Sequence, residues 1–156
     1  MKYSRFLIMI ATSTVVMFAL MYLNTYDVSH ALFSQTRMWM ALVMGTAMAV
    51  LMLAFMHRMY RDARINLMIV LACAAVFGSA LWLVRSQATV DDVAYMKAMI
   101  PHHSIAILTS ERARITDPRV RQLADGIIAT QEREIAEMQN LIQELQQSRD
   151  ADQRER

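Results

Sequence analysis

The chain has 156 residues, of which 56% are hydrophobic, and it contains 15 methionines but only three glycines and two prolines. This composition indicates a helical protein with part of its length in a membrane. Residues 1–88 carry 7 Lys/Arg and 2 Asp/Glu, whereas residues 89–156 carry 9 and 12. Because the polar half is acidic and has no basic stripe, the sequence argues against nucleic-acid binding. The single cysteine, Cys73, excludes an internal disulfide and a CxxC redox site.

Three apolar segments come first in the chain, at residues 6–23, 38–56 and 65–84. Each is uncharged and long enough to cross about 30 Å of hydrocarbon as a helix. The first segment has an alternative interpretation as a cleaved signal peptide, because Lys2 and Arg5 precede it. Its length and the lack of a small-x-small cleavage site favour a membrane helix instead. We therefore expect a three-helix membrane domain over residues 1–86.

The loops between these segments predict the orientation of the chain. Lys2 and Arg5 precede the first segment and three arginines stand in residues 57–64, whereas the loop at residues 24–37 carries only Arg37. The positive-inside rule then places the N-terminus in the cytoplasm. The C-terminal region emerges on the opposite side, which for a bacterial inner membrane is the periplasm.

A polar helical hairpin is expected over residues 87–147. Thr89 with Asp92 three residues later is typical of a capping box, which predicts a helix from there to about Ile115. The segment "TDP" predicts a turn, with Asp117 as the N-cap of the next helix and Pro118 at its first position.

The second helix of the hairpin is expected to run to about Gln147, and residues 148–156 to form a charged tail. The predicted fold class is therefore all-α, with three transmembrane helices followed by a soluble antiparallel hairpin.

The stretch "AYMKAMIPHHSIAIL" (residues 94–108) holds the residue types that bear chemistry. At about 100° per residue, Met96, Met99 and His103 share the apolar sector of the first hairpin helix, and His102 lies on its flank. Pro101 lacks the N–H that would bond to residue 97, so a kink is open at this turn.

On the second helix, Gln131 lies in the middle of the apolar sector and Glu134 lies on its edge. If the turn centres on Asp117, residues equidistant from it lie level, which pairs His103 with Gln131 and Met96 with Met138. The expected cluster comprises Met96, Met99, His103, Gln131 and Met138, with His102 and Glu134 at its border.

Soft thioether sulfurs together with imidazole favour Cu(I) or Ag(I). A di-iron bundle would need Glu-x-x-His pairs, which are absent from the sequence. Ordinary core packing by methionines with a hydrogen-bonded histidine is the alternative interpretation.

The stretches "YMKAMIPHHSIAI" and "DPRVRQLADGIIATQEREIAEM" resemble the bacterial domain-of-unknown-function 305 family. The resemblance covers roughly residues 89–145 and implies a ferritin-like helical architecture, with copper or silver binding by some periplasmic members. Position by position, it implies Met96, Met99, His102, His103 and Met138 as metal ligands, with Gln131 and Glu134 as supporting groups.

The sequence departs from the family pattern directly after the histidines. The family usually continues with Gln-Gly-Ala, an acidic residue and a further methionine. Here the chain has Ser104, Ile105 and Ala106, then Leu108 and Thr109, so one sulfur and one polar neighbour are missing.

A second group of methionines lies in the middle apolar segment. Its members recur every four residues: Met40, Met44, Met48, Met52 and Met56. A period of four drifts by about 40° per step on a helix of 3.6 residues per turn. The row is therefore expected to wind around its helix as apolar filler rather than to line a copper path.

Two soluble helices alone cannot enclose a core, which predicts a homodimer forming a four-helix bundle or a heteromeric protein partner. Two functions follow from these observations. One is a membrane-anchored periplasmic protein that buffers or transfers Cu(I) as its suspected cofactor. The other is a non-enzymatic membrane interaction or assembly module whose hairpin dimerises or docks without metal. No nucleophile–base pair, phosphate loop or catalytic carboxylate pair is visible, so no enzyme is expected.

Overall fold

The computed structural model describes residues 3–154, and the part described is all-α. Lys2, used above to predict the orientation, lies outside the described residues. The elements are α1 (Tyr3–Leu20), the short 3₁₀-helix η1 (Val28–His30), α2 (Gln35–Phe55), α3 (Ala63–Ser86), α4 (Asp92–Arg112) and α5 (Pro118–Arg154). They divide into two compact units. One holds residues up to 21 together with residues 35–89, and the other holds residues 22–34 and 90–156.

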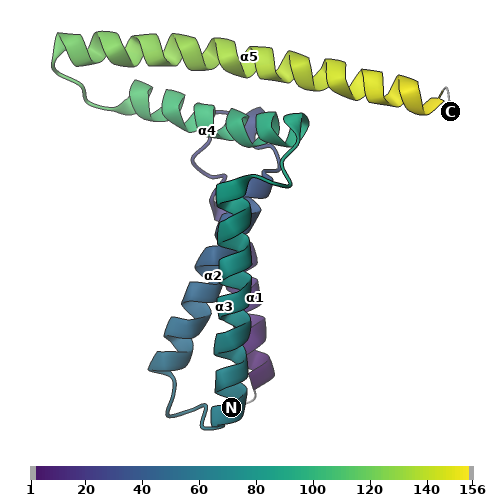
Figure 1. The fold of residues 1–156 in the computed structure, drawn as a ribbon. Helices are drawn as coiled ribbons and strands as arrows, with labels where there is room; N and C mark the ends of the chain where they lie inside the picture. The colour runs from purple at the N-terminus through teal and green to yellow at the C-terminus, as the bar shows by residue number, and fades with distance from the viewer. Residues whose placement is uncertain (1–2, 155–156) are drawn as a thin grey trace. The chain divides into compact units, whose positions relative to one another are not determined.

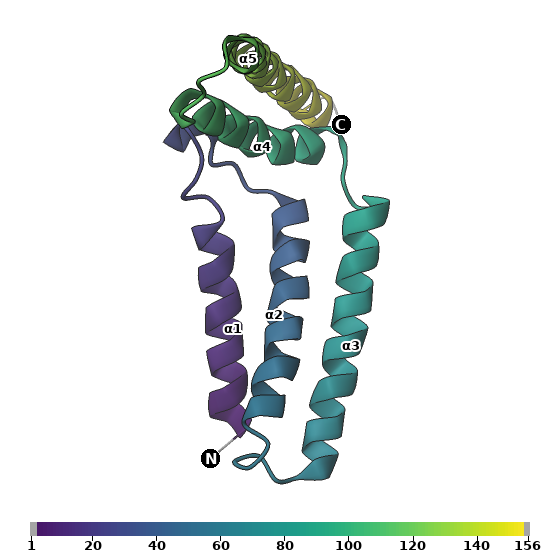
Figure 2. The ribbon, with the colours of Figure 1, turned by 90° about the vertical axis from the view of Figure 1, so that its left-hand side faces the viewer.

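The first unit consists of α1, α2 and α3, and α2 lies between the other two helices (Figure 2). All three are long and apolar enough to cross a membrane, as the sequence predicts. Their large apolar side chains point mostly outward; Ile8, Leu51 and Leu71, for example, are exposed. Such an apolar exterior is expected of helices that are solvated by lipid rather than by water.

Close packing within this unit depends on a glycine and on one aromatic cluster. A Cβ added at Gly45 on α2 would collide with the side chain of Thr14 on α1. At one end of the unit, the Tyr60 ring packs against Tyr3 and Phe6, with ring centroids 4.9 and 5.3 Å away. Small residues that let helices approach closely are typical of membrane helix pairs.

The second unit is built on the antiparallel pair α4 and α5 (Figure 1), which confirms the predicted hairpin. Asp117 accepts a hydrogen bond from the backbone N–H of Arg119 at 2.8 Å, and α5 begins at Pro118, also as predicted. The predicted capping box at Thr89 is wrong. The N-cap of α4 is Asp91, whose carboxylate accepts from the N–H of Ala94 at 2.8 Å.

Both hairpin helices also end elsewhere than the sequence pattern predicts. Helix α4 ends at Arg112 instead of about Ile115, because Ala113 turns to an extended conformation. Helix α5 continues to Arg154, beyond the predicted end at Gln147. No proline or glycine interrupts residues 148–154, and Arg149 of this segment reaches Asp91 at 3.3 Å.

The hairpin core is an apolar seam between α4 and α5. Its buried members are Val93, Met96, Ile100, Ile107, Ile135 and Ile142. Pro101 is buried within α4, which stays helical through it to Arg112. The inward positions therefore keep the regular helical spacing on both sides of the proline.

The connection between α1 and α2 packs on the hairpin as part of the second unit. The hydroxyl of Ser104, which is fully buried on α4, accepts a hydrogen bond from the backbone N–H of Tyr26 at 2.7 Å and lies 3.0 Å from Nδ1 of His30. Leu32 packs against the hairpin core. Asp27 caps η1, and the Ser29 hydroxyl donates a hydrogen bond to its carboxylate, which lowers the pKa of Asp27.

Candidate metal centre

A solvent-open pocket of about 650 Å³ lies between α4 and the middle of α5. It is lined by Asp92, Tyr95, Met96, Met99, His103, Glu134, Glu137, Met138, Leu141, Glu144 and Leu145. Four of the five predicted ligands are therefore brought together, along with the predicted supporting residue Glu134. A volume of this size belongs to the range of small-molecule sites, so an ion bound to the sulfurs would leave room for a further ligand.

His103 is fixed in orientation by its own helix. Its Nδ1 lies 2.9 Å from the carbonyl oxygen of Met99. Because a carbonyl only accepts, Nδ1 donates a proton to it, and Nε2 faces the pocket and the carboxyl group of Glu134. A hydrogen bond of this kind is the usual device that sets the tautomer of a metal-binding histidine.

The direct partner of His103 across the hairpin is Glu134, not Gln131. Nε2 of His103 lies 2.8 Å from Oε2 of Glu134. Gln131 contacts the same carboxylate oxygen through Nε2, at 3.4 Å. The side chain that His103 contacts is thus three residues further along α5 than the pairing with Gln131 predicts.

His102 does not belong to this cluster. It is exposed, whereas only 13% of the His103 side chain is exposed, and it does not line the pocket. The two rings lie edge to face with centroids 6.2 Å apart. Adjacent helical residues point about 100° apart, so one histidine of the pair faces inward and the other faces solvent.

Three pocket carboxylates, of Asp92, Glu137 and Glu144, were not predicted. Helical spacing marks two of them, because Glu137 and Glu144 stand seven residues apart on α5, next to the stripe that holds Met138. Close by, Asp91 and Arg149 tie the beginning of α4 to the end of α5. The backbone N–H of Ala94 is the main cause of the lowered pKa of Asp91, and Arg149 contributes.

Ser104 was not predicted either, although it is a small polar residue at a core position of α4. It lies about 40° from Ile100 and about 60° from Ile107 on the helical wheel, and all three are buried. Its partners lie in residues 22–34, and two apolar segments separate these residues from α4 in the sequence. Spacing within α4 marks Ser104 as buried but cannot identify these partners.

The donor set has a distinct chemical character. The pocket offers three thioether sulfurs, one imidazole nitrogen and nearby carboxylates. Among residues 3–154, no three or more His, Cys, Asp or Glu side chains are grouped closely enough to hold an ion by themselves. Thioether sulfur together with imidazole is a donor set that favours soft ions.

Comparison with known proteins concerns the C-terminal part of the chain. A family model described as "Domain of unknown function (DUF305)" matches residues 92–156. Residues 92–156 form a DUF305 domain. The DUF305 domain thus covers α4, the turn and α5, and all the residues that line the pocket.

One curated relative is "Uncharacterized protein L153" of Acanthamoeba polyphaga mimivirus. It is 46% identical over 66 residues, which cover 41% of this chain and 43% of the relative. The matched part is thus less than half the length of either protein. No solved structure matches this chain.

Proposed function

We propose that this protein is a membrane-anchored Cu(I)- or Ag(I)-binding protein whose DUF305 domain buffers or transfers the ion outside the cytoplasm. The observation that carries the proposal is the convergence of Met96, Met99, Met138 and His103 on one pocket. Thioether and imidazole donors select soft monovalent ions, because hard ions bind oxygen ligands more strongly.

Within the pocket, each group has a different task. The sulfurs and Nε2 of His103 bind the ion. The carbonyl of Met99 holds the His103 ring in place through Nδ1. In the metal-free protein one proton lies between Nε2 of His103 and Oε2 of Glu134. An ion that binds Nε2 would displace this proton, and the carboxylate would stay near as a negative charge. Gln131 orients that carboxylate.

The open pocket suits exchange of the ion with another carrier. Asp92, Glu137 and Glu144 give the pocket a negative potential that attracts cations. The three apolar helices anchor the domain in the bilayer. The arginines of the α2–α3 loop favour a cytoplasmic position for that loop, and with it a periplasmic or other extracytoplasmic position for the DUF305 domain.

The two histidines provide the sharpest test of this proposal. Full-length protein in detergent is titrated with Cu(I) against a chromophoric chelator, using wild type, His103→Ala and His102→Ala. Wild type should bind about one ion per chain. Loss of a residue that only hydrogen-bonds to a metal ligand typically weakens metal affinity about 10- to 100-fold. We expect His103→Ala to weaken Cu(I) affinity by more than this, and His102→Ala to change it little. Equal losses in both variants, or no binding by wild type, would contradict the proposal.

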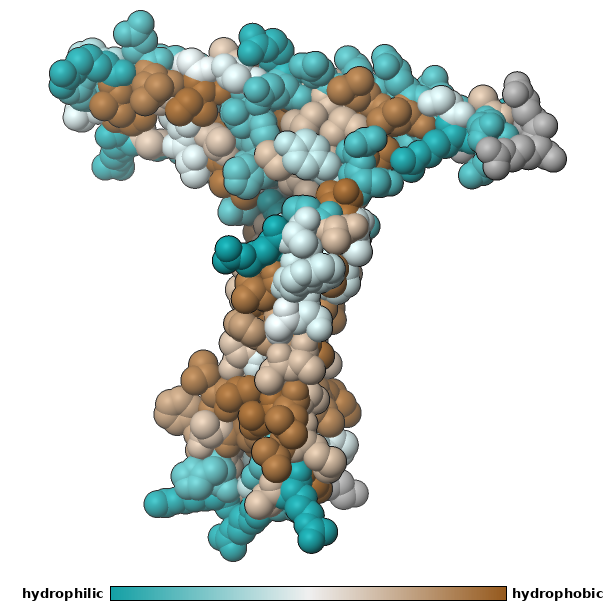
Figure 3. All heavy atoms as spheres, viewed as in Figure 1, coloured by the Kyte–Doolittle hydropathy of each residue, from teal (hydrophilic) through white to brown (hydrophobic). Residues whose placement is uncertain are grey.

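A second candidate function, the interaction module, is favoured by a different observation. Val120, Leu123 and Ile127 are exposed on α5 near the turn, and 65% of Leu123 is exposed. Figure 3 shows hydrophobic side chains gathered at this end of the DUF305 domain. In this function a second copy of the chain, or another protein, covers these residues.

Leu123→Glu tests the interaction module. It should abolish association in analytical ultracentrifugation of the detergent-solubilised protein. Ile135→Glu is a poor choice for this purpose, because Ile135 is buried within its own hairpin. A monomeric wild-type chain would contradict a homodimeric module.

A further inference from the structure

At the end of the first unit where α2 connects to α3, the chain presents arginines on a closely tied loop. The loop carries Arg58 and Arg61, α3 carries Arg64 in its first turn, and α1 carries Arg5. All four are exposed. Figure 3 shows hydrophilic side chains here, beyond the hydrophobic part of the same unit.

The bonds that tie the loop to α1 and α3 do not involve the guanidinium groups. The side-chain amide of Asn66 donates to the carbonyl of Tyr60 at 2.7 Å, and the Tyr3 hydroxyl donates to Oδ1 of Asn66 at 2.8 Å. The Tyr60 ring is buried against Tyr3 and Phe6. These contacts fix the loop to α1 and α3, so the arginines project from an ordered backbone.

The guanidinium groups have no carboxylate partner among residues 3–154. Asp62 is the nearest acidic residue in sequence, and its Oδ1 accepts the backbone N–H groups of Arg64 and Ile65 at 3.0 and 3.2 Å, as the N-cap of α3. Arg61 donates through Nε to the carbonyl of Arg58 at 3.1 Å, which leaves its terminal nitrogens available. The positive charge here is therefore not neutralised by this part of the protein.

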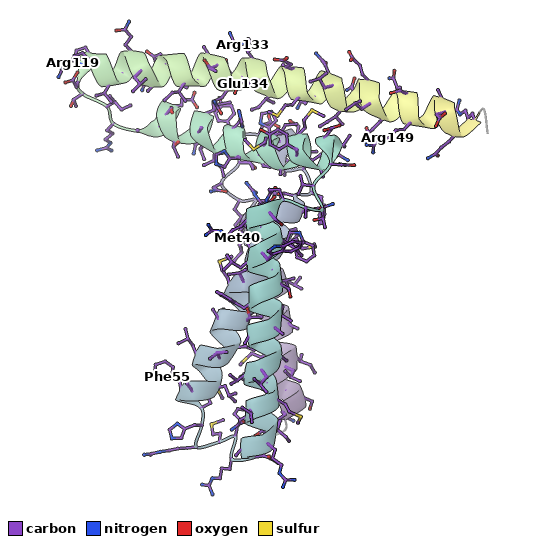
Figure 4. All side chains as sticks on the ribbon, viewed as in Figure 1. Met40, Phe55, Arg119, Arg133, Glu134 and Arg149 are labelled. Carbon is purple, nitrogen blue, oxygen red and sulfur yellow. The ribbon has the colours of Figure 1, made fainter. Side chains whose placement is uncertain are left out.

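Apolar side chains lie directly beside these charges. Phe55 at the end of α2 is 82% exposed and projects away from the helices (Figure 4). Met59, between Arg58 and Tyr60, is also exposed. A surface that offers guanidinium groups next to apolar side chains matches a phospholipid, which joins an anionic headgroup to acyl chains.

We propose that this end of the first unit binds anionic phospholipid. The guanidinium groups of Arg58, Arg61 and Arg64 bind the phosphate through charge-assisted hydrogen bonds. Phe55 and Met59 contact the upper part of the acyl chains. The site is separate from the metal pocket, so it would survive failure of the copper-binding function.

Lipid titration of the full-length protein in non-ionic detergent tests this site, with bound lipid counted by native mass spectrometry. Wild type should retain phosphatidylglycerol and retain phosphatidylcholine far more weakly. Each arginine near an anionic surface is worth about a fivefold change in binding. The variant R58Q/R61Q/R64Q should therefore bind phosphatidylglycerol on the order of a hundredfold more weakly.

Matched variants distinguish loss of this site from a general loss of positive charge. R112Q/R114Q/R133Q removes three exposed arginines from the DUF305 domain and should bind phosphatidylglycerol like wild type. R58K/R61K/R64K keeps the charge and should retain most of the binding. Asn66→Ala frees the loop and should weaken binding several-fold.

Three results would overturn the proposal. They are undiminished phosphatidylglycerol binding by R58Q/R61Q/R64Q, an equal loss in R112Q/R114Q/R133Q, and displacement of the lipid by millimolar inorganic phosphate, which would mean a general anion site. Thermal unfolding of each variant within a few degrees of wild type shows that the loop substitutions leave the fold intact.

Discussion

The chain contains two groups of methionines, and the structure places them in different surroundings. On α2, Met40 and Met44 are exposed, whereas Met52 and Met56 pack against the aromatic cluster of the first unit. The row thus winds around its helix, as a period of four predicts. In the DUF305 domain, the methionines instead line one pocket together with His103 and Glu134.

This difference shows what makes methionine a candidate ligand. Sulfur in an apolar surrounding is ordinary packing material, and spacing along one helix does not change that. Sulfur from two helices that meet beside an oriented imidazole can share an ion. The predictions that follow test this distinction, from the largest expected effect to the smallest.

Replacing the methionines of each group should have opposite consequences. M96L/M99L/M138L keeps the side-chain volume nearly constant and removes the sulfurs, so Cu(I) uptake should be lost while the hairpin stays folded. M44L/M48L/M52L, the matched change on α2, should leave uptake intact. Chelator competition measures uptake, and circular dichroism checks the fold. Loss of uptake in the α2 variant would remove the distinction between the groups.

A change in the packing of α2 should spare the pocket. Gly45→Leu forces a side chain against Thr14 and should destabilise the first unit by about 1–3 kcal/mol, as overpacking does. Gly78→Leu is the control, because no atom lies within 4 Å of the position of its Cβ. Thermal unfolding in detergent measures both. Cu(I) affinity should stay unchanged in either variant. A fall in Cu(I) affinity together with stability would show that the α2 region contributes to the site.

Removing the contact between α4 and the loop at residues 22–34 should have a moderate effect. Ser104→Ala leaves the N–H of Tyr26 without its acceptor, which costs about 1–3 kcal/mol for a buried group. Hydrogen exchange should increase in residues 22–34, and Ser104→Thr should restore part of the protection. Unchanged exchange would contradict the packing of this loop on α4.

The smallest effect is expected at the turn, far from both methionine groups. The side chain and the backbone N–H of Arg119 lower the pKa of Asp117. Its contribution to stability is therefore present above the unfolded-state pKa and is lost as pH falls through the lower folded-state value. Asp117→Ala should lower the unfolding temperature slightly at pH 7, and the difference from wild type should shrink below pH 4. A difference that is independent of pH would contradict this cause.

Much of the fold could be predicted because each step depends on local pattern. Uncharged apolar runs identify the three long helices, and "TDP" fixes the beginning of α5. The prediction failed where two local signals competed. Thr89 and Asp91 can both cap a helix, and only the structure shows that Asp91 does so.

Part of the candidate site could be predicted from the sequence, but most of its carboxylates and its geometry could not. Helical periodicity selects Met96, Met99, His103 and Met138 as inward residues. The contact between His103 and Glu134 joins two helices, and periodicity within either helix does not identify which side chain of α5 lies opposite His103. The contact between Ser104 and residues 22–34 joins distant parts of the chain, and no local pattern encodes it.

The most direct test of the central claim is X-ray absorption spectroscopy at the copper edge on full-length protein loaded with one equivalent of Cu(I). We expect a first shell dominated by sulfur, with one imidazole nitrogen. The sulfur contribution should vanish in M96L/M99L/M138L and persist in M44L/M48L/M52L. A first shell of nitrogen and oxygen alone, or sulfur that persists in M96L/M99L/M138L, would contradict the assignment of the pocket as a soft-metal site.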